Sequence, residues 1–509
     1  MTQRKKAWVE TYGCQMNVAD GELMQGILAA SGYALASNPE EADVILVNTC
    51  AIRDHAEQRV IGRVGELARI KQERPDVILG VTGCMAQRMG NTLLERAGYV
   101  ELVMGPDNYR KLPEVLAGLR PSDATATANN DEAQHREPKQ GEAQHEAANL
   151  GGRMSAATPP PPPTQSARRG LPVLPVTAAT TTKPSKPERL AVLDFAAHEN
   201  YEGLEVRRTS RVSAWVPVQR GCNYRCTYCI VPYVRGSEKN RDPQQILAEA
   251  RSIAEQGIPE IVLLGQTVNS YEHDGWDFAR LLREVARVDG IRRVRFTSPH
   301  PNDFTPQLVE VMATEPTVCK QLHLPVQSGS NRTLKRMLRR YTVEHYLEKI
   351  ELVRRAIPTI ALSTDIIVAF PGETHEEYEA TLELMRHVRY DDAYLYKYSP
   401  RDGTPATRLP TDEFVPADEA QERLERLIAL HRGIQSEINH AEVGRTVEVL
   451  IEREARSAGD VLGRTDSNKV VAFPGDVARI GQFTHVRLDS TTGATFAGSE
   501  QFEPAERVA

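Results

Sequence analysis

The sequence has no long hydrophobic run, and this argues against a membrane-spanning helix. Its uninterrupted apolar stretches are short, Ile261–Leu264 among them, whereas a transmembrane helix needs roughly 18 apolar residues or more. The basic start, Met1–Lys6, continues directly into the alternating stretch Trp8–Tyr12, without the apolar block that a signal peptide requires. We therefore expect a cytosolic protein that has no contact with membranes.

The sequence also has no excess of positive charge. It contains 62 Lys and Arg against 69 Asp and Glu, a net charge of -7, which excludes the class of broadly basic nucleic-acid binders. Any contact with RNA must therefore use local patches. A chain of 509 residues with 40% hydrophobic and 26% charged residues is typical of a soluble protein with two to four domains.

Cysteine is scarce, and its number is odd, which argues against a fully paired disulfide framework. In a reducing compartment such thiols more often bind metal or take part in catalysis. The seven cysteines are Cys14, Cys50, Cys84, Cys222, Cys226, Cys229 and Cys319.

The pattern of apolar residues predicts an α/β protein with three folded parts. Residues 4–118 alternate short strands and helices, as in a parallel sheet with crossover helices. Residues 119–190 are rich in Ala, Thr, Gln and Pro, which predicts a disordered insertion. Residues 208–438 carry six strand and helix units of an open or partial (βα)6 barrel, and residues 441–503 read as a small β-barrel. The expected strands are Ala7–Tyr12, Asp43–Asn48, Val77–Val81, Val100–Met104, Trp215–Gln219, Ile261–Leu264, Val294–Thr297, Gln321–Leu324, Leu362–Val368, Ala393–Tyr398, Thr446–Ile451 and His485–Leu488, and two of the expected helices are Gly21–Ser31 and Ala56–Arg74.

The strongest local signal is a CxxxCxxC loop that directly follows the expected strand Trp215–Gln219. Its thiols are Cys222, Cys226 and Cys229, and Tyr228 precedes the last of them. Three thiolates at this spacing can hold three irons of a 4Fe-4S cluster and leave the fourth iron open. The alternative is a zinc knuckle, but structural zinc prefers four protein ligands, and the next histidine downstream is His273.

Three further cysteines each follow a strand of the first domain. Cys14, Cys50 and Cys84 are spaced by about one strand and helix unit, and the carboxyl ends of parallel strands meet at one edge of the sheet. Three thiolates at that edge can hold a second cluster. The alternative is three ordinary buried cysteines, since cysteine is often a core residue. Cys319 lacks such surroundings, and we expect it to be a core thiol.

These features resemble the methylthiotransferase family of radical S-adenosylmethionine (SAM) enzymes. The resemblance covers nearly the whole chain outside residues 119–190, and the pattern after Cys14 and around Pro325 favours the tRNA branch over the ribosomal-protein branch. The segments that carry it are Tyr12–Asn17, Gly221–Asn223, Val231–Gly236, Leu264–Tyr271 and His323–Ser330.

The resemblance implies an activity, cofactors and partners. It implies methylthiolation of C2 of N6-dimethylallyladenosine, 3′ to the anticodon of tRNA, by a protein that acts as a monomer. One 4Fe-4S cluster on Cys222, Cys226 and Cys229 would cleave SAM reductively, and a second on Cys14, Cys50 and Cys84 would carry the sulfur. An electron donor such as flavodoxin or ferredoxin would be needed. The terminal barrel resembles the RNA-binding TRAM domain.

Other polar residues lie near the expected active rim. Tyr228, Gln266, Ser298, Gln327 and Asp365 are predicted to contact SAM or substrate, although most of them could equally cap helices or complete turns. The run Phe370–Thr374 can be read as a family segment near SAM or as a helix-opening turn. Basic residues recur at Arg207, Arg208 and Arg211, at Arg292, Arg293 and Arg295, and at Arg332, Lys335, Arg336, Arg339 and Arg340. The last group could face a phosphate backbone or could be a solvated helix face, and Phe473 and Phe483 are possible base-stacking platforms.

Three other functions remain open from the sequence. The first is methylthiolation of threonylcarbamoyl-adenosine in tRNA, and the second is methylthiolation of a ribosomal-protein aspartate. The third, from a different class, is a non-enzymatic iron-sulfur or zinc protein that binds RNA.

Overall fold

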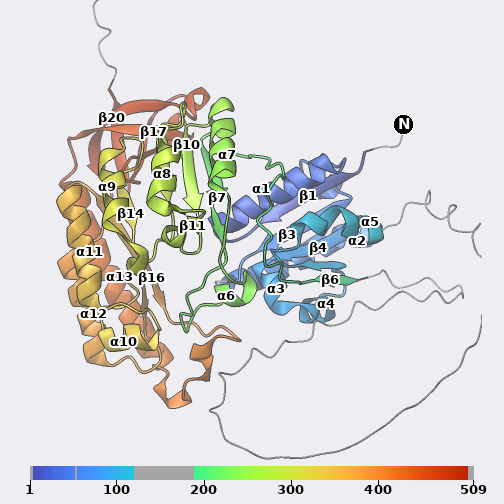
Figure 1. The fold of residues 1–509 in the computed structure, drawn as a ribbon, viewed down its shortest axis with the longest axis horizontal. Coiled ribbons are helices and arrows are strands. Elements are labelled where there is room, and N and C mark those ends of the chain that lie inside the picture. Colours follow the sequence, from blue (N-terminus) through green and yellow to red (C-terminus); the bar gives the residue numbers. More distant parts are fainter. Residues whose placement is uncertain (1–3, 52–53, 120–188, 502–509) are drawn as a thin grey trace, which may run out of the picture. The chain divides into compact units, whose positions relative to one another are not determined.

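The computed structural model describes residues 4–51, 54–119 and 189–501. The predicted insertion at residues 119–190 therefore lies almost wholly outside the described residues. Among those residues, no helix has both the length and the apolar character needed to cross a membrane. The folded parts follow one another along the chain as a parallel sheet domain, a core of six strand and helix units, and a closed β-barrel (Figure 1).

The first domain is a six-stranded, wholly parallel sheet with the order β2-β1-β3-β4-β5-β6. Its two central strands, β3 and β4, are buried at every residue, as expected of parallel strands covered on both faces. The strands are β1 (Lys6–Thr11), β2 (Ala34–Leu35), β3 (Val44–Thr49), β4 (Ile78–Gly83), β5 (Leu102–Met104) and β6 (Leu190–Val192), and the helices are α1 (Gln15–Ala30), α2 (Asp54–Glu73), α3 (Cys84–Met89), α4 (Asn91–Arg96) and α5 (Leu112–Leu119).

The four strands predicted for this domain are confirmed, and two more were missed. Strand β2 has only two residues, and β6 is separated from the rest of the sheet by the long segment after α5. Helix α1 begins at Gln15, six residues before the predicted start at Gly21. Its first turns bury Asn17, Asp20 and Glu22, so their polarity hid the helix from a reading based on apolar periodicity.

The middle of the chain forms the predicted partial barrel as two three-stranded parallel sheets. One has the order β13-β10-β7 and the other β14-β15-β16, and a parallel bridge between Val294 and Val318 links the first to the segment that enters β14. All six predicted strands are present within one or two residues. They are β7 (Ser213–Pro217), β10 (Glu260–Leu264), β13 (Arg293–Phe296), β14 (Gln321–His323), β15 (Ala361–Val368) and β16 (Asp392–Lys397).

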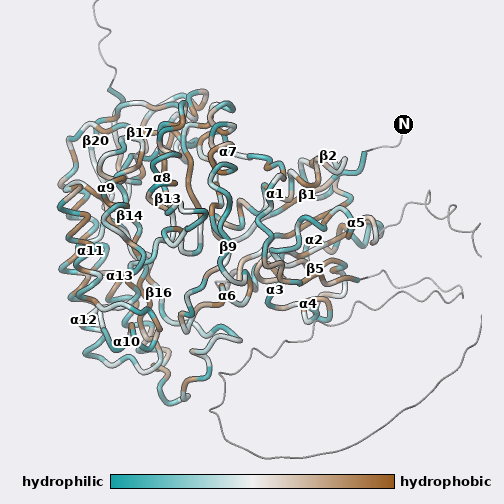
Figure 2. Tube along the Cα trace, in the orientation of Figure 1, coloured by the Kyte–Doolittle hydropathy of each residue, from teal (hydrophilic) through white to brown (hydrophobic). Residues whose placement is uncertain are grey.

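Helices follow these strands, and side-chain caps fix where several of them begin. Asp277, Thr305, Thr342 and Thr374 each accept a hydrogen bond from a backbone N–H in the first turn of the helix that follows, which satisfies donors that have no partner within the helix. Helices α11 and α12 alternate hydrophilic and hydrophobic residues along their length (Figure 2). The helices are α6 (Val231–Val234), α7 (Pro243–Glu255), α8 (Phe278–Ala286), α9 (Pro306–Thr314), α10 (Asn331–Arg336), α11 (Val343–Ala356), α12 (His375–Val388) and α13 (Ala417–His440), and two short hairpins are formed by β8 (Gln219–Arg220) with β9 (Lys239–Asn240) and by β11 (Glu272–His273) with β12 (Trp276–Asp277).

The chain ends in the predicted β-barrel, which is closed in the order β17-β18-β19-β21-β20. Apolar side chains alternate into its interior, and Phe473 and Phe496 are almost completely buried there. The predicted role of Phe473 as a base-stacking platform is therefore wrong, because its ring fills the barrel core. The strands are β17 (Thr446–Glu454), β18 (Asp460–Thr465), β19 (Val470–Pro474), β20 (Phe483–Thr491) and β21 (Phe496–Glu500).

Two buried arginines of strand β13 bind the barrel. Arg295 pairs with Glu260 at 2.9 Å and donates to the carbonyl oxygens of Thr465 and Asp466 at 2.8 and 2.9 Å. Arg293 donates to the carbonyl oxygen of Arg464 at 2.7 Å. Arg293 and Arg295 therefore anchor the barrel on the partial barrel.

We expect Arg295→Gln to loosen the barrel, because it leaves the buried Glu260 without its cation, a change that costs about 3–5 kcal/mol. Amide hydrogen exchange should accelerate around Thr465 and Asp466. The matched control is Arg292→Gln, whose side chain is 53% exposed and pairs with Glu448, and which should cost less than about 1 kcal/mol. Equal exchange in both variants would contradict the anchoring role.

Candidate active site

The three cysteines of the first domain lie at the carboxyl ends of neighbouring strands. Cys14 is the N-cap of α1 and follows β1, Cys50 follows β3, and Cys84 is the first residue of α3 and follows β4. Strands β1, β3 and β4 are adjacent in the sheet. The thiols therefore lie at one edge of the sheet.

Hydrogen bonds tie the three cysteine loops to one another. Asn17 donates to the carbonyl oxygen of Thr49 at 3.0 Å, and Asn48 donates to the carbonyl oxygen of Asn17 at 2.7 Å. The hydroxyl of Thr49 donates to the carbonyl oxygen of Thr82 at 2.6 Å, and the thiol of Cys14 donates to Asn17 Oδ1 at 3.3 Å. These buried contacts fix the loops before any ligand is bound.

Glycines allow the loops to approach this closely. Gly13 has φ of 134°, and a Cβ on it would lie 2.5 Å from Cys50 Cβ. Gly83 has φ of 91°, and a Cβ there would lie 2.5 Å from the carbonyl oxygen of Thr49. Both positions combine a left-handed backbone with a close neighbour, so they require glycine.

The three thiols differ in their electrostatics. The pKa of Cys14 is lowered to about 6, first by a hydrogen bond with Cys50 and also by the positive charge of Arg235. Burial raises the pKa of Cys84, although Arg235 opposes this shift. In the part of the chain that the structure describes, no group of three or more His, Cys, Asp or Glu side chains is arranged to hold a single metal ion.

The CxxxCxxC loop lies between the short strand β8 and helix α6. Cys222 N–H donates to the carbonyl oxygen of Gly236 at 3.2 Å, and Cys229 N–H donates to that of Cys226 at 3.0 Å. The Sγ of Cys222 lies 3.2 Å from the hydroxyl of Thr267, and the guanidinium of Arg339 donates to Cys226 Sγ at 3.3 Å. Burial raises the pKa of Cys222 and that of Cys229, the latter to about 12.

A buried ion triplet connects the two cysteine sites. Asp20 of α1 is fully buried and lies 2.8 Å from the guanidinium of Arg220 and 2.8 Å from that of Arg235. Arg220 stands two residues before Cys222. Arg235 lies next to Cys14, whose pKa its charge helps to lower, and next to Cys84, where it opposes the rise in pKa that burial causes. One carboxylate therefore holds two arginines of the partial barrel against the first domain.

We expect Asp20→Asn to destabilise the protein by about 3–5 kcal/mol, because two buried guanidinium groups lose their anion. Denaturant unfolding followed by tryptophan fluorescence measures the change. Glu41→Gln is the control, since Glu41 pairs with Lys6 on the surface and such exposed pairs contribute at most about 1 kcal/mol. If the two variants unfolded alike, the triplet would not hold the domains.

The residues predicted to contact SAM or substrate lie beside both sheets. Gln266 and Ser298 follow β10 and β13, and the N–H of Val268 donates to the carbonyl oxygen of Ser298 at 3.3 Å. The Oε1 atom of Gln266 is buried and has no hydrogen-bond partner among the described residues. A free acceptor of this kind suits an ammonium group such as the amino group of SAM.

Of the other predicted contacts, Gln327 and Asp365 belong to the second sheet, and Tyr228 belongs to the cysteine loop. Gln327 has φ of 72°, and its backbone forms a bridge beside Ile366 of β15. Asp365 lies 3.5 Å from His323 Nε2. Tyr228 packs against an apolar cluster of Met337, Phe370 and Ala406. These roles as SAM or substrate contacts remain predictions.

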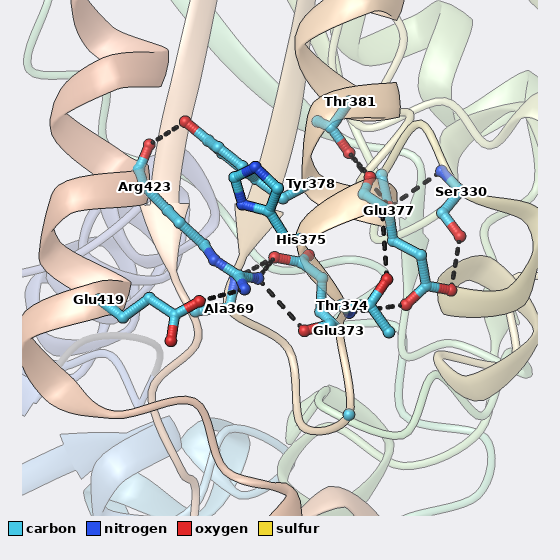
Figure 3. Close-up of polar contacts among 12 residues, drawn as sticks. Ser330, Ala369, Glu373, Thr374, His375, Glu377, Tyr378, Thr381, Glu419 and Arg423 are labelled. Atoms are coloured by element: carbon cyan, nitrogen blue, oxygen red, sulfur yellow. Dashed lines mark hydrogen bonds and ion pairs between the residues drawn. The ribbon is translucent and has the colours of Figure 1, made fainter.

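The run Phe370–Thr374 opens helix α12, as the turn reading of the sequence predicted (Figure 3). Thr374 and Glu377 form a capping box, and Glu377 also accepts from the hydroxyl of Ser330 at 2.9 Å. Buried Glu373 accepts from the N–H of Ala369 at 2.8 Å and from Arg423 at 2.7 Å (Figure 3). The turn thus fixes the end of β15 and the loop that carries Gln327.

Most of the basic residues that were candidates for phosphate binding form ion pairs or are buried. Arg332 pairs with Glu377 at 2.8 Å, Arg336 pairs with Glu413, and Arg339 is buried beside Cys226. Burial therefore removes Arg339 from a phosphate-facing stripe, and phosphate contact by the exposed Arg332, Lys335 and Arg340 stays a prediction. Arg208 is likewise buried, between Glu22 and Glu249. The ring of Phe483 is covered by the guanidinium groups of Arg292 and Arg293, at 3.7 and 4.8 Å from its centroid.

Sequence reasoning missed several residues of the site. Asp20, Arg220 and Arg235 belong to the ion triplet, Asn17 and Asn48 tie the cysteine loops, and Thr267 and Arg339 contact thiols of the second group. One signal in the sequence could have found some of them. Asn17, Asp20 and Glu22 lie among apolar residues of one helix, and polar side chains in such a place are buried only when they have partners.

Three family models match the chain. Residues 6–105 match Uncharacterized protein family UPF0004, residues 216–385 match the Radical SAM superfamily, and residues 440–498 match the TRAM domain.

Curated relatives match over nearly the full length. The tRNA-2-methylthio-N(6)-dimethylallyladenosine synthase of Thermoanaerobacter sp. (strain X514) is 40% identical over 96% of this chain and 91% of its own. The protein of that name from Prosthecochloris aestuarii is 38% identical over 99% of each chain. Among solved structures, the radical SAM methyltransferase TsrM from Kitasatospora setae is similar with a TM-score of 0.51, 15% identity, and coverage of 79% of this chain and 74% of its own. This last similarity supports the fold.

Proposed function

The chain belongs to the family of tRNA-2-methylthio-N(6)-dimethylallyladenosine synthases, and we propose that it attaches a methylthio group to C2 of N6-dimethylallyladenosine, 3′ to the anticodon of tRNA. It is a radical SAM tRNA methylthiotransferase. The observation that carries the proposal is the pair of three-thiol sites joined by Asp20, Arg220 and Arg235.

The radical SAM family implies one 4Fe-4S cluster and SAM. The thiols of Cys222, Cys226 and Cys229 suit that cluster, because soft thiolates favour iron-sulfur centres. The free Oε1 of Gln266 and the backbone near Ser298 would orient SAM. When bound, this pair supplies a radical able to break an unactivated aromatic C–H bond, which acid–base side chains cannot do.

A second cluster on Cys14, Cys50 and Cys84 is part of the proposal. Three soft donors at one sheet edge, preset by Asn17, Asn48 and Thr49, fit a second open site. Arg235 lies beside these thiols, helps to lower the pKa of Cys14 and opposes the rise that burial causes in the pKa of Cys84, and its positive charge favours the anionic, ligating form of both. The chain therefore offers a place to hold sulfur close to a place where a radical would be made.

The RNA partner follows from the names of the relatives and from the match to the TRAM domain. We propose that the terminal barrel, held in place by Arg293 and Arg295, binds tRNA while the anticodon loop reaches the thiol sites. An electron donor such as flavodoxin or ferredoxin would reduce the protein, which we propose acts as a monomer in the cytoplasm.

Mass spectrometry of tRNA nucleosides tests the substrate. A strain that lacks the gene should accumulate N6-dimethylallyladenosine without its 2-methylthio form, and a plasmid copy of the wild-type gene should restore it. Unchanged 2-methylthio-N6-dimethylallyladenosine in the deletion strain would contradict the proposal. Loss of the methylthio derivative of threonylcarbamoyl-adenosine instead would assign the chain to that substrate.

A further inference from the structure

Arg339 is a buried cation that points to the site formed by Cys222, Cys226 and Cys229. Its guanidinium donates to Cys226 Sγ at 3.3 Å, to the hydroxyl of Tyr341 at 2.9 Å and to the carbonyl oxygen of Pro325 at 3.4 Å. The residue is 6% exposed. The three contacts come from different segments, so they fix both the position and the plane of the guanidinium.

The backbone around Arg339 is held in an unusual conformation. Leu338 and Arg340, its two neighbours, have φ of 56° and 59°, in the left-handed region that residues other than glycine rarely adopt. Both neighbours are exposed, while Arg339 between them is buried. Such conformations persist only where the surroundings impose them, and they gather at functional sites. The loop after α10 is therefore shaped to turn one side chain inward.

Arg339 differs from the other buried arginines in its lack of a carboxylate partner. Arg220 and Arg235 share Asp20, Arg295 pairs with Glu260, and Arg423 pairs with Glu373. Over the described ranges, no Asp or Glu lies within ion-pair distance of Arg339.

The polar groups around Arg339 are mostly neutral in the ordinary pH range. His300 is uncharged, since burial and the nearby Arg339 lower its pKa to about 2. Tyr228 and Tyr341 are phenols whose pKa values burial raises. A buried charge needs a counter-charge. Among the contacts of Arg339 in the described part of the chain, Cys226 Sγ at 3.3 Å is the thiol that becomes anionic when it binds metal.

We propose that Arg339 is the resident counter-cation of the Cys222, Cys226 and Cys229 site, and that it positions and electrostatically stabilises the thiolate-bound cluster there. The inference rests on the proposed function, since it requires a cluster at these thiols. Arg339 is a positioning residue: it acts through Cys226. A positive charge at this place favours the more negative, reduced state of an anionic centre, so it also raises the tendency of the site to accept an electron.

The first test compares the metal-free and the reconstituted full-length protein. Arg339→Met removes the charge and keeps most of the side-chain volume, and Arg340→Met makes the same change at the exposed neighbour. Without metal, Arg339→Met should melt at or above the wild-type temperature, because an unpaired buried cation is removed. After anaerobic reconstitution, it should gain less thermal stability and hold less iron than wild type or Arg340→Met. A loss of stability that is equal with and without metal would show a merely structural role and overturn the proposal.

The second test measures the reduction of the cluster by EPR in a chain whose Cys14, Cys50 and Cys84 are all alanine, so that one site remains. Arg339→Gln should lower the equilibrium constant for reduction at least tenfold, a shift of about 59 mV to lower potential for one electron. Arg339→Lys should recover most of it. An unchanged potential in Arg339→Gln, or a shift that appears only after SAM is added, would overturn the assignment. If wild-type protein held no cluster at these thiols, the proposed function would fail instead.

Discussion

Cys226→Ala should abolish the reductive cleavage of SAM. The variant removes one of three thiols that the loop brings together, and the thiol it removes is the one held by Arg339 at 3.3 Å. Cys319, the one described cysteine outside both groups, cannot replace it, because it lies beside Val294 and Arg295 of β13. Formation of 5′-deoxyadenosine under dithionite should fall by more than about 10³-fold, as expected when a group that acts as part of a unit is lost.

Liquid chromatography with mass spectrometry of 5′-deoxyadenosine measures this effect. Cys319→Ala is the control, since Cys319 is a buried thiol outside both groups. It should retain most of the activity. Cleavage at the wild-type rate in Cys226→Ala would show that the loop does not hold the radical-forming cluster.

Cys50→Ala should block methylthio transfer to tRNA and leave SAM cleavage within a few-fold of wild type. Cys50 belongs to the first site, where it forms a hydrogen bond that lowers the pKa of Cys14. The site that would cleave SAM has its own thiols, Cys222, Cys226 and Cys229, and its own buried cation, Arg339. SAM cleavage should therefore not depend on Cys50. Transfer should fall by more than about 10³-fold, because the three thiols act as a unit.

The two activities should be measured in one reaction mixture, with unmodified tRNA as substrate and with iron content determined for each preparation. Cys50→Ala should hold about half the iron of wild type if each site carries one four-iron cluster. A variant that lost both activities equally would refute the division of labour between the two cysteine groups.

The architecture and the two thiol groups could be predicted because they depend on local signals. Strands β3 and β10 contain the continuous apolar runs Val44–Val47 and Ile261–Leu264, and such runs are typical of buried parallel strands. Cys14, Cys50 and Cys84 follow strands at one unit of spacing, so their meeting at one edge required only the rule that parallel strands end together.

The electrostatic parts of the site could not be predicted, because they join residues far apart in the chain. Asp20 pairs with Arg220 and Arg235 across some 200 residues or more, and no spacing rule relates them. Arg339 was read with its neighbours as part of an exposed stripe, since helical periodicity does not reveal two left-handed residues that turn one side chain inward. Phe473 was predicted to stack on RNA bases, although buried and partly exposed side chains alternate along β19 and place Phe473 inside the barrel.

Strand β6 has a consequence for synthesis of the protein. The edge of the first sheet is completed by Leu190–Val192, about 70 residues after α5 ends at Leu119. A nascent chain that has emerged only as far as α5 exposes the unpaired edge of β5, and the sheet closes only when residue 192 has left the ribosome. The order of synthesis therefore makes closure of this sheet a late step, because all of the chain between α5 and β6 has to be made first.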